Sequence, residues 1–94
     1  MIKLIEVFKL PQRNQYTLRE IYVNPKHVVA LREEVGFKQK LVEGQLPDDL
    51  DSRQDFTRLT LDRGQSGLDV VVIGAPHIIE NKIHGTNEKQ LLTD

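Results

Sequence analysis

Four aspartates stand close together in the middle of the sequence, where they could hold a cation or contact a partner. They are Asp48, Asp49, Asp51 and Asp55. A calcium-binding loop also needs a glycine within it and a glutamate at its end, and this run has neither in the required place. We therefore predict a solvated acidic segment that serves as a contact for a partner protein, and no metal site there.

Histidines and serines, the other side chains with catalytic potential, are few and scattered. The histidines are His27, His77 and His84, and the serines are Ser52 and Ser66. Neither serine lies in the Gly-x-Ser-x-Gly turn of a hydrolase nucleophile. The chain also contains no cysteine, which excludes thiol nucleophiles, thiolate metal sites and disulfides. We predict a protein that is not an enzyme and has no metal or cofactor.

Basic side chains recur along the segments expected to form a sheet. Arg19, Lys26, Arg32, Arg58 and Arg63 could share one face, together with Arg13 and with Tyr16, Tyr22 and Phe56 as stacking platforms for bases. Acidic residues are interleaved with them, however, and the net charge is −1, from 13 basic and 14 acidic residues. Because no overall positive field results, we prefer an ordinary solvated surface and keep nucleic-acid binding as the alternative.

The length and composition predict one small aliphatic core. A chain of 94 residues is long enough for one core and too short for two. With three Phe and no Trp, that core must consist mainly of Ile, Leu and Val, which favour strands. The first ten residues lack the apolar run of a signal peptide, and no segment is apolar enough to span a membrane, so we expect a cytoplasmic protein.

The first third of the chain predicts three strands. Residues 2–10 carry apolar groups on both alternating faces, which is typical of a strand that is covered on both sides or bends. Residues 16–23 form a second strand pattern. The Asn24-Pro25 pair then predicts a sharp turn, because the asparagine side chain bonds to nearby backbone and the proline fixes its own φ. For residues 27–35 we choose strand over helix because of the paired valines.

Residues 36–55 are the least regular part of the sequence. They contain two glycines, a proline and the acidic group. Since twenty residues are many for a loop without structure in a small domain, we expect a mobile insertion or a small ordered excursion, with a helical turn starting at Pro47.

The pattern is clearer from Phe56 onwards. Thr57, Leu59 and Leu61 alternate with polar residues, as in a half-buried strand, whereas residues 68–73 are nearly all apolar and predict a central strand. The segment Gly64-Gln65-Ser66-Gly67 has the spacing of a phosphate clamp, but that clamp joins helices in KH domains. Here it separates two strand patterns, so we predict an antiparallel hairpin.

A short helix is predicted after the hairpin. It should begin at Pro76 and bury one apolar stripe, formed by Ala75, Ile78, Ile79 and Ile83. Gly85 offers a left-handed cap at its end. We therefore predict a single β-rich domain over residues 1–85 with an insertion at 36–55, followed by a flexible tail over 86–94.

Taken together, these elements resemble the FlbD family, small proteins encoded in bacterial flagellar operons. The motifs that carry the resemblance are Met1-Ile2-Lys3, Tyr22-Val23-Asn24-Pro25, residues 27–34, Thr57-Arg58-Leu59-Thr60-Leu61, Val70-Val71-Val72 and Ile79-Glu80-Asn81-Lys82-Ile83. The insertion at 36–55 departs from the family pattern, and so does the Gly-Ala-Pro-His helix start, which makes a distant relative encoded by a phage an equal alternative. The resemblance implies no catalytic residues.

The sequence therefore predicts a β-rich α+β fold, either a small curved antiparallel sheet or an SH3-like barrel, with about five strands and one short C-terminal helix. We expect a non-catalytic protein-interaction or regulatory module that binds a protein partner and self-associates through an edge strand. The alternative is a nucleic-acid-binding regulator that uses the arginines.

Overall fold

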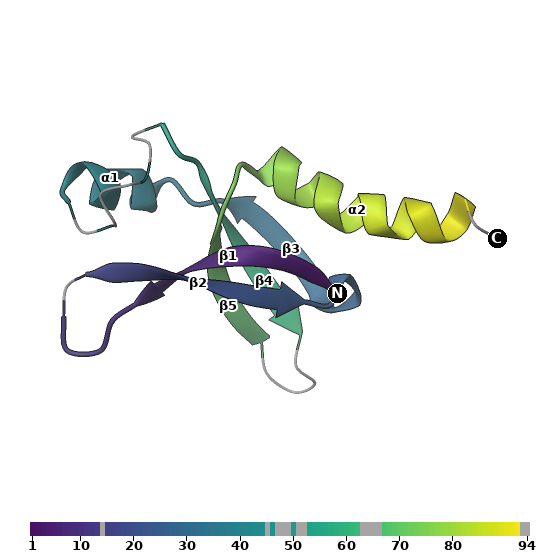
Figure 1. The fold of residues 1–94 in the computed structure, drawn as a ribbon, viewed down its shortest axis with the longest axis horizontal. Helices are drawn as coiled ribbons and strands as arrows, with labels where there is room; N and C mark the ends of the chain where they lie inside the picture. Colours follow the sequence, from purple (N-terminus) through teal and green to yellow (C-terminus); the bar gives the residue numbers. More distant parts are fainter. Residues whose placement is uncertain (14, 45, 47–49, 51–52, 63–66, 93–94) are drawn as a thin grey trace.

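A computed structural model of the chain describes residues 1–13, 15–44, 46, 50, 53–62 and 67–92, with the side chains of residues 38, 42 and 86–92 excepted. The elements are β1 (Ile2–Lys9), β2 (Tyr16–Val23), the 3-10 helix η1 (Pro25–His27), β3 (Val28–Glu33), α1 (Gly36–Val42), β4 (Phe56–Asp62), β5 (Gly67–Ile73) and α2 (Pro76–Leu92). Figure 1 shows the strands crossing the centre of the molecule, with α1 and α2 on opposite sides of the view.

The strands form one antiparallel sheet in the order β2-β1-β5-β4-β3. The sheet is open, so β2 and β3 are its two edges, and of the two predicted architectures the curved sheet is correct and the closed barrel is not. Within the described residues, neither outer edge pairs with a further strand. The prediction of a β-rich α+β fold is confirmed.

Strand β5 lies at the centre of the sheet, as its apolar sequence predicted. Val70, Val71 and Val72 are all buried, although they alternate between the two faces. The partner strand β4 shows the predicted period of two, because Leu59 and Leu61 pack with the core under α2 whereas Phe56 packs on the opposite face. β4 and β5 pair in antiparallel register, Phe56 with Ile73 and Leu61 with Leu68; the turn at 63–66 lies outside the described residues.

One face of the sheet is covered by α2. Ile79 and Ile83 are buried against Leu4, Leu59 and Val72, and burial of each isoleucine stabilises the fold by about 1.5–3 kcal/mol. The prediction that Ile78 shares this stripe is wrong: its side chain is 46% exposed. Ile78 lies 100° from Ile79 around the helix. The sheet covers the side of α2 that carries Ile79 and Ile83, and the side chain of Ile78 lies at the margin of that contact.

The entry to α2 requires a glycine. Gly74 has φ of +126°, and a Cβ there would lie 3.0 Å from Cδ1 of Ile79. The Thr57 hydroxyl donates to the Gly74 carbonyl at 2.7 Å, which ties β4 to this bend. The helix then continues past Gly85 to Leu92, so the predicted cap at Gly85 is wrong. Glycine is only a weak helix breaker, and Gly85 has no positive φ here.

The opposite face carries a second core beneath α1. The Phe37 ring lies 5.1 Å from that of Tyr16 and 5.7 Å from that of Phe56, and Val7 and Val71 are buried in the same cluster. The segment predicted to be irregular thus contains an ordered helix, α1. The helical turn predicted to start at Pro47 falls outside the described residues.

Candidate functional site

The acidic segment can be placed only in part. Asp48, Asp49 and Asp51 lie outside the described residues. Asp55 is partly buried at the start of β4, where its carbonyl accepts from the Gly74 amide at 2.9 Å and from Gln54 Nε2 at 3.0 Å. The backbone of Asp55 therefore helps to hold α2 at its entry, and the predicted partner contact stays a prediction.

The sheet divides the arginines between its two faces. Arg19 shares a face with Val72, because both stand opposite Glu6. Arg58 stands opposite Val71, so it projects from the other face, and Arg32 stands opposite Arg58. Lys26 lies in η1, and Arg63 lies outside the described residues.

Two of these arginines, Arg19 and Arg58, are also paired with carboxylates. Arg19 Nε donates to Glu6 Oε1 at 2.7 Å, and its guanidinium lies 3.7 Å from the centre of the Phe8 ring. Arg58 Nε donates to Glu34 Oε2 at 2.6 Å, and its Nη1 lies 3.7 Å from Asp69 Oδ2. A phosphate would have to compete with these carboxylates, which disfavours the alternative of a single nucleic-acid-binding face.

The histidines are dispersed. His27 Nδ1 lies 3.1 Å from the Asp62 carbonyl, whereas His84 Nε2 lies 3.6 Å from Glu80 Oε1 on α2. His77 lies at the start of the same helix. In the part of the chain that the structure describes, no three His, Asp or Glu side chains gather as a metal site would require.

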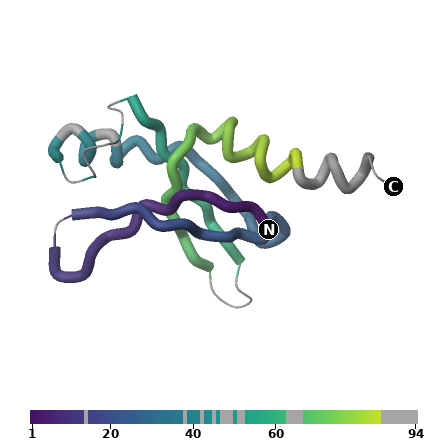
Figure 2. Tube along the Cα trace, in the orientation of Figure 1, coloured from purple at the N-terminus to yellow at the C-terminus, as the bar shows by residue number. Residues whose placement is uncertain are grey.

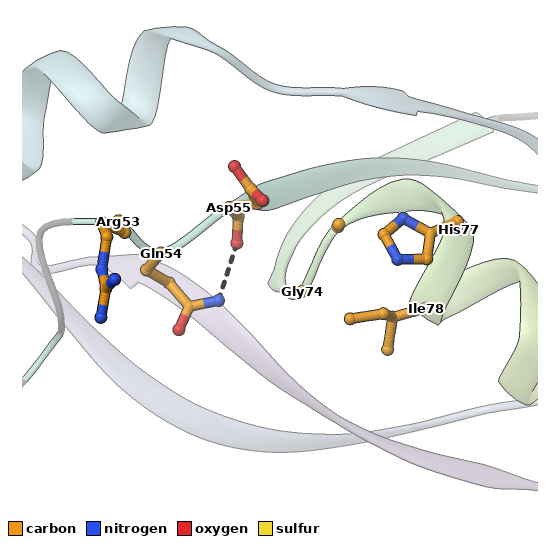
Figure 3. A pocket seen from close by; sticks show the side chains of 7 residues that line it. Arg53, Gln54, Asp55, Gly74, His77 and Ile78 are labelled. Carbon is orange, nitrogen blue, oxygen red and sulfur yellow. Dashed lines mark hydrogen bonds between the residues drawn. The ribbon is translucent and has the colours of Figure 1, made fainter.

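A hollow of about 310 Å³ lies where the segment before β4 meets the start of α2. Figure 3 shows Arg53 and Gln54 on one side and Gly74, His77 and Ile78 on the other. The dashed line is the Gln54 bond to the Asp55 carbonyl. The hollow is shallow and its lining mixes polar and apolar residues. Its described lining residues do not present a nucleophile paired with a base, as a catalytic site would.

A second hollow lies between the edge strand β3 and the helix α2. Its volume is about 280 Å³. The lining comes from Pro25, Val28, Val29, Ala30 and Leu31 on the strand side and from Glu80, Ile83 and His84 on α2. We call this set the β3–α2 groove. The strand side is wholly apolar, and Val29 is 61% exposed.

The backbone of β3 has hydrogen-bonding groups beside this groove that point away from β4. The Glu34 amide donates to the Phe56 carbonyl at 2.9 Å, which fixes the phase of the β3–β4 ladder. Because bonding alternates along an antiparallel strand, Arg32 and Ala30 face β4, whereas the N–H and C=O groups of Leu31 and Glu33 point outward. The register shifts between Val28 and Ala30, so Val29 sits in a bulge.

Sequence reasoning missed this groove because it depends on which strands lie at the edges. The apolar run Val28-Val29-Ala30-Leu31 was visible, but the same run would suit a buried strand. The groove forms because α2 packs beside β3, so that residues of both elements line it.

Comparisons with known proteins add no relative: a scan against protein-family models gives no match, and neither do searches of curated proteins and of solved structures. The resemblance to the FlbD family stays a prediction. No helix among the described residues has the length and apolarity to cross a membrane.

Proposed function

We propose that the protein is a non-catalytic interaction module that binds an extended segment of a partner protein along β3. The partner segment adds a strand to the sheet, and its side chains on the α2 side enter the β3–α2 groove. The observation that supports this most directly is the outward-facing backbone of Leu31 and Glu33 beside an apolar hollow. Strand addition next to a helix is a recurring mode of peptide recognition, in which backbone bonds give affinity and side-chain pockets give specificity.

The chemistry of the groove defines the partner segment. Leu31 packs against the core under α2, and Glu33, two residues on, projects from the same face and is exposed. A partner residue opposite Leu31 would also contact Ile83, so it should be apolar. The partner residue opposite Glu33 should be Lys or Arg, because opposite charges across a strand pair attract. The expected ligand is therefore an extended peptide with an apolar and a basic residue two positions apart.

A substitution at Glu33 tests the proposal without touching the core. Glu33→Pro removes the outward N–H, which β4 does not use, and Glu33→Ala removes the carboxylate while keeping that N–H. The probe is a phage-displayed library of random eight-residue peptides selected on the intact chain. We expect selected peptides to show the apolar-x-basic pattern, to lose at least about tenfold in affinity with Glu33→Pro, equivalent to about 1.4 kcal/mol, and to lose less with Glu33→Ala.

Amide chemical shifts locate the contact in the same experiment. Perturbations should concentrate on Leu31, Glu33 and Ile83. Selected peptides that perturb β2 or the acidic segment instead, or that bind Glu33→Pro unchanged, would refute binding at this groove.

A further inference from the structure

The other edge of the sheet, β2, differs in kind from β3. It pairs with β1 over eight residues, from Tyr16 to Val23, without a register shift. It contains no proline and no glycine, and Figure 2 shows it crossing β1 in this view, with β1 between β2 and α2 near the N-terminus. Among the described residues no strand pairs with its outer side, and a long, regular edge of this kind is a template for another strand.

The direction of its free groups follows from one hydrogen bond. The Leu10 amide donates to the Gln15 carbonyl at 3.0 Å, which sets the phase of the β1–β2 ladder. By alternation, Tyr16, Leu18, Glu20 and Tyr22 point their backbone N–H and C=O groups outward. Their side chains share the face that carries the α1 core, where Tyr16 and Leu18 are partly buried.

We infer that β2 pairs antiparallel with β2 of a second copy of this chain, around a twofold axis at Leu18, so that two sheets join into one. A twofold axis sets one residue opposite its own copy. An axis at Arg19 or Glu20 would oppose like charges, which is destabilising. An axis at Ile21 would set Arg19 opposite Val23, which is buried.

The axis at Leu18 avoids these conflicts. It sets Leu18 opposite Leu18, Thr17 opposite Arg19 and Tyr16 opposite Glu20 of the other copy. The two apolar clusters around Tyr16, Leu18 and Phe37 then approach each other across the axis. This surface is distinct from the β3–α2 groove, so the inference does not depend on the proposed function.

The pairing would be weak and reversible. A single strand pair buries less than the roughly 1,600 Å² of a standard interface, so we expect a dissociation constant on the order of tens of micromolar. Sedimentation velocity of the full chain, from low micromolar to several hundred micromolar, should show a monomer–dimer equilibrium. Glu20→Pro, which removes an outward N–H of β2, should abolish the dimer, whereas Glu20→Ala and Glu33→Pro should retain it.

Single cysteines test the register, because the natural chain has none. Two Cα atoms in a hydrogen-bonded pair lie about 5.5 Å apart, a separation that suits a disulfide. Leu18→Cys should therefore form a covalent dimer under mild oxidation, at least about tenfold faster than Glu20→Cys, whose copies would lie about 13 Å apart along the strands. Circular dichroism of each variant is the control that checks whether it is folded.

Three results would overturn the inference. The first is a natural chain that stays monomeric at every concentration. The second is higher oligomers in place of a dimer, which would indicate pairing of β2 with β3. The third is equal or faster cross-linking of Glu20→Cys, which would place the axis elsewhere.

Discussion

The two edges of the sheet expose similar backbone groups but in different surroundings. β2 is eight residues long and regular, whereas β3 has six residues, a bulge at Val29 and a helix beside it. A regular edge can accept an equally long strand, and the strand most available at high concentration is its own copy. A short edge beside a groove accepts only a segment whose side chains fit the groove. The surroundings of an edge, more than its free hydrogen bonds, therefore decide what can pair with it.

A substitution at Ile79, which holds α2 on the sheet, should destabilise the whole fold and with it both sheet edges. Ile79 is fully buried, so Ile79→Asp places an unpaired carboxylate in the core and should cost more than about 4 kcal/mol. Urea unfolding followed by circular dichroism measures this loss. Ile78→Asp is the matched control, one residue away and 46% exposed, and should cost less than about 1 kcal/mol. An equal loss of unfolding free energy in the two variants would contradict the packing of α2 on the sheet through Ile79.

A matched pair of exposed apolar residues separates the two edges. Val29 on β3 is 61% exposed and Tyr22 on β2 is 62% exposed. Val29→Lys places a charge in the β3–α2 groove and should weaken binding of a selected peptide about tenfold, or about 1.4 kcal/mol. Tyr22→Lys should change the same affinity by less than about twofold. Fluorescence anisotropy of a labelled peptide measures both, and the reverse order would place the peptide on β2.

The smallest effect concerns a surface ion pair next to the β2 edge. Lys3 Nζ lies 3.7 Å from Glu20 Oε1, and both side chains are more than half exposed. Water and salt screen such a pair, so Lys3→Ala should lower the free energy of unfolding by no more than about 0.5 kcal/mol. Urea unfolding gives this value. A loss above about 1 kcal/mol would mean that the Lys3–Glu20 pair stabilises the fold more than is usual for an exposed ion pair.

Local patterns predicted most of the sheet. The alternation in residues 56–61 and the apolar run in 68–73 identified a half-buried strand and the central strand, because side-chain periodicity directly reflects which faces are covered. The Asn24-Pro25 turn was also predicted for its physical reason: Asn24 Oδ1 accepts from the Lys26 amide at 3.0 Å.

Features that depend on distant partners were not predictable. Helix α1 has no N-terminal side-chain cap and begins at a glycine, so its own sequence favours a helix only weakly. The packing of Phe37 against Tyr16 and Phe56 stabilises the helix instead. The exposure of Ile78 depends on how far the sheet extends beneath α2. The candidate groove needed the strand order, which no local pattern contains, and the arginines could not be assigned to faces without the register.

The bulge in β3 also bears on solubility. Open sheets with two regular edges can add molecules at both ends and grow into fibrils, since each new molecule offers a fresh edge. In this protein the extra residue at Val29 interrupts the ladder spacing on one edge, and a bulge twists a strand away from flat pairing. Among the described residues, β2 is then the edge suited to regular pairing with a second copy, and in the proposed dimer growth of the sheet would end at two molecules.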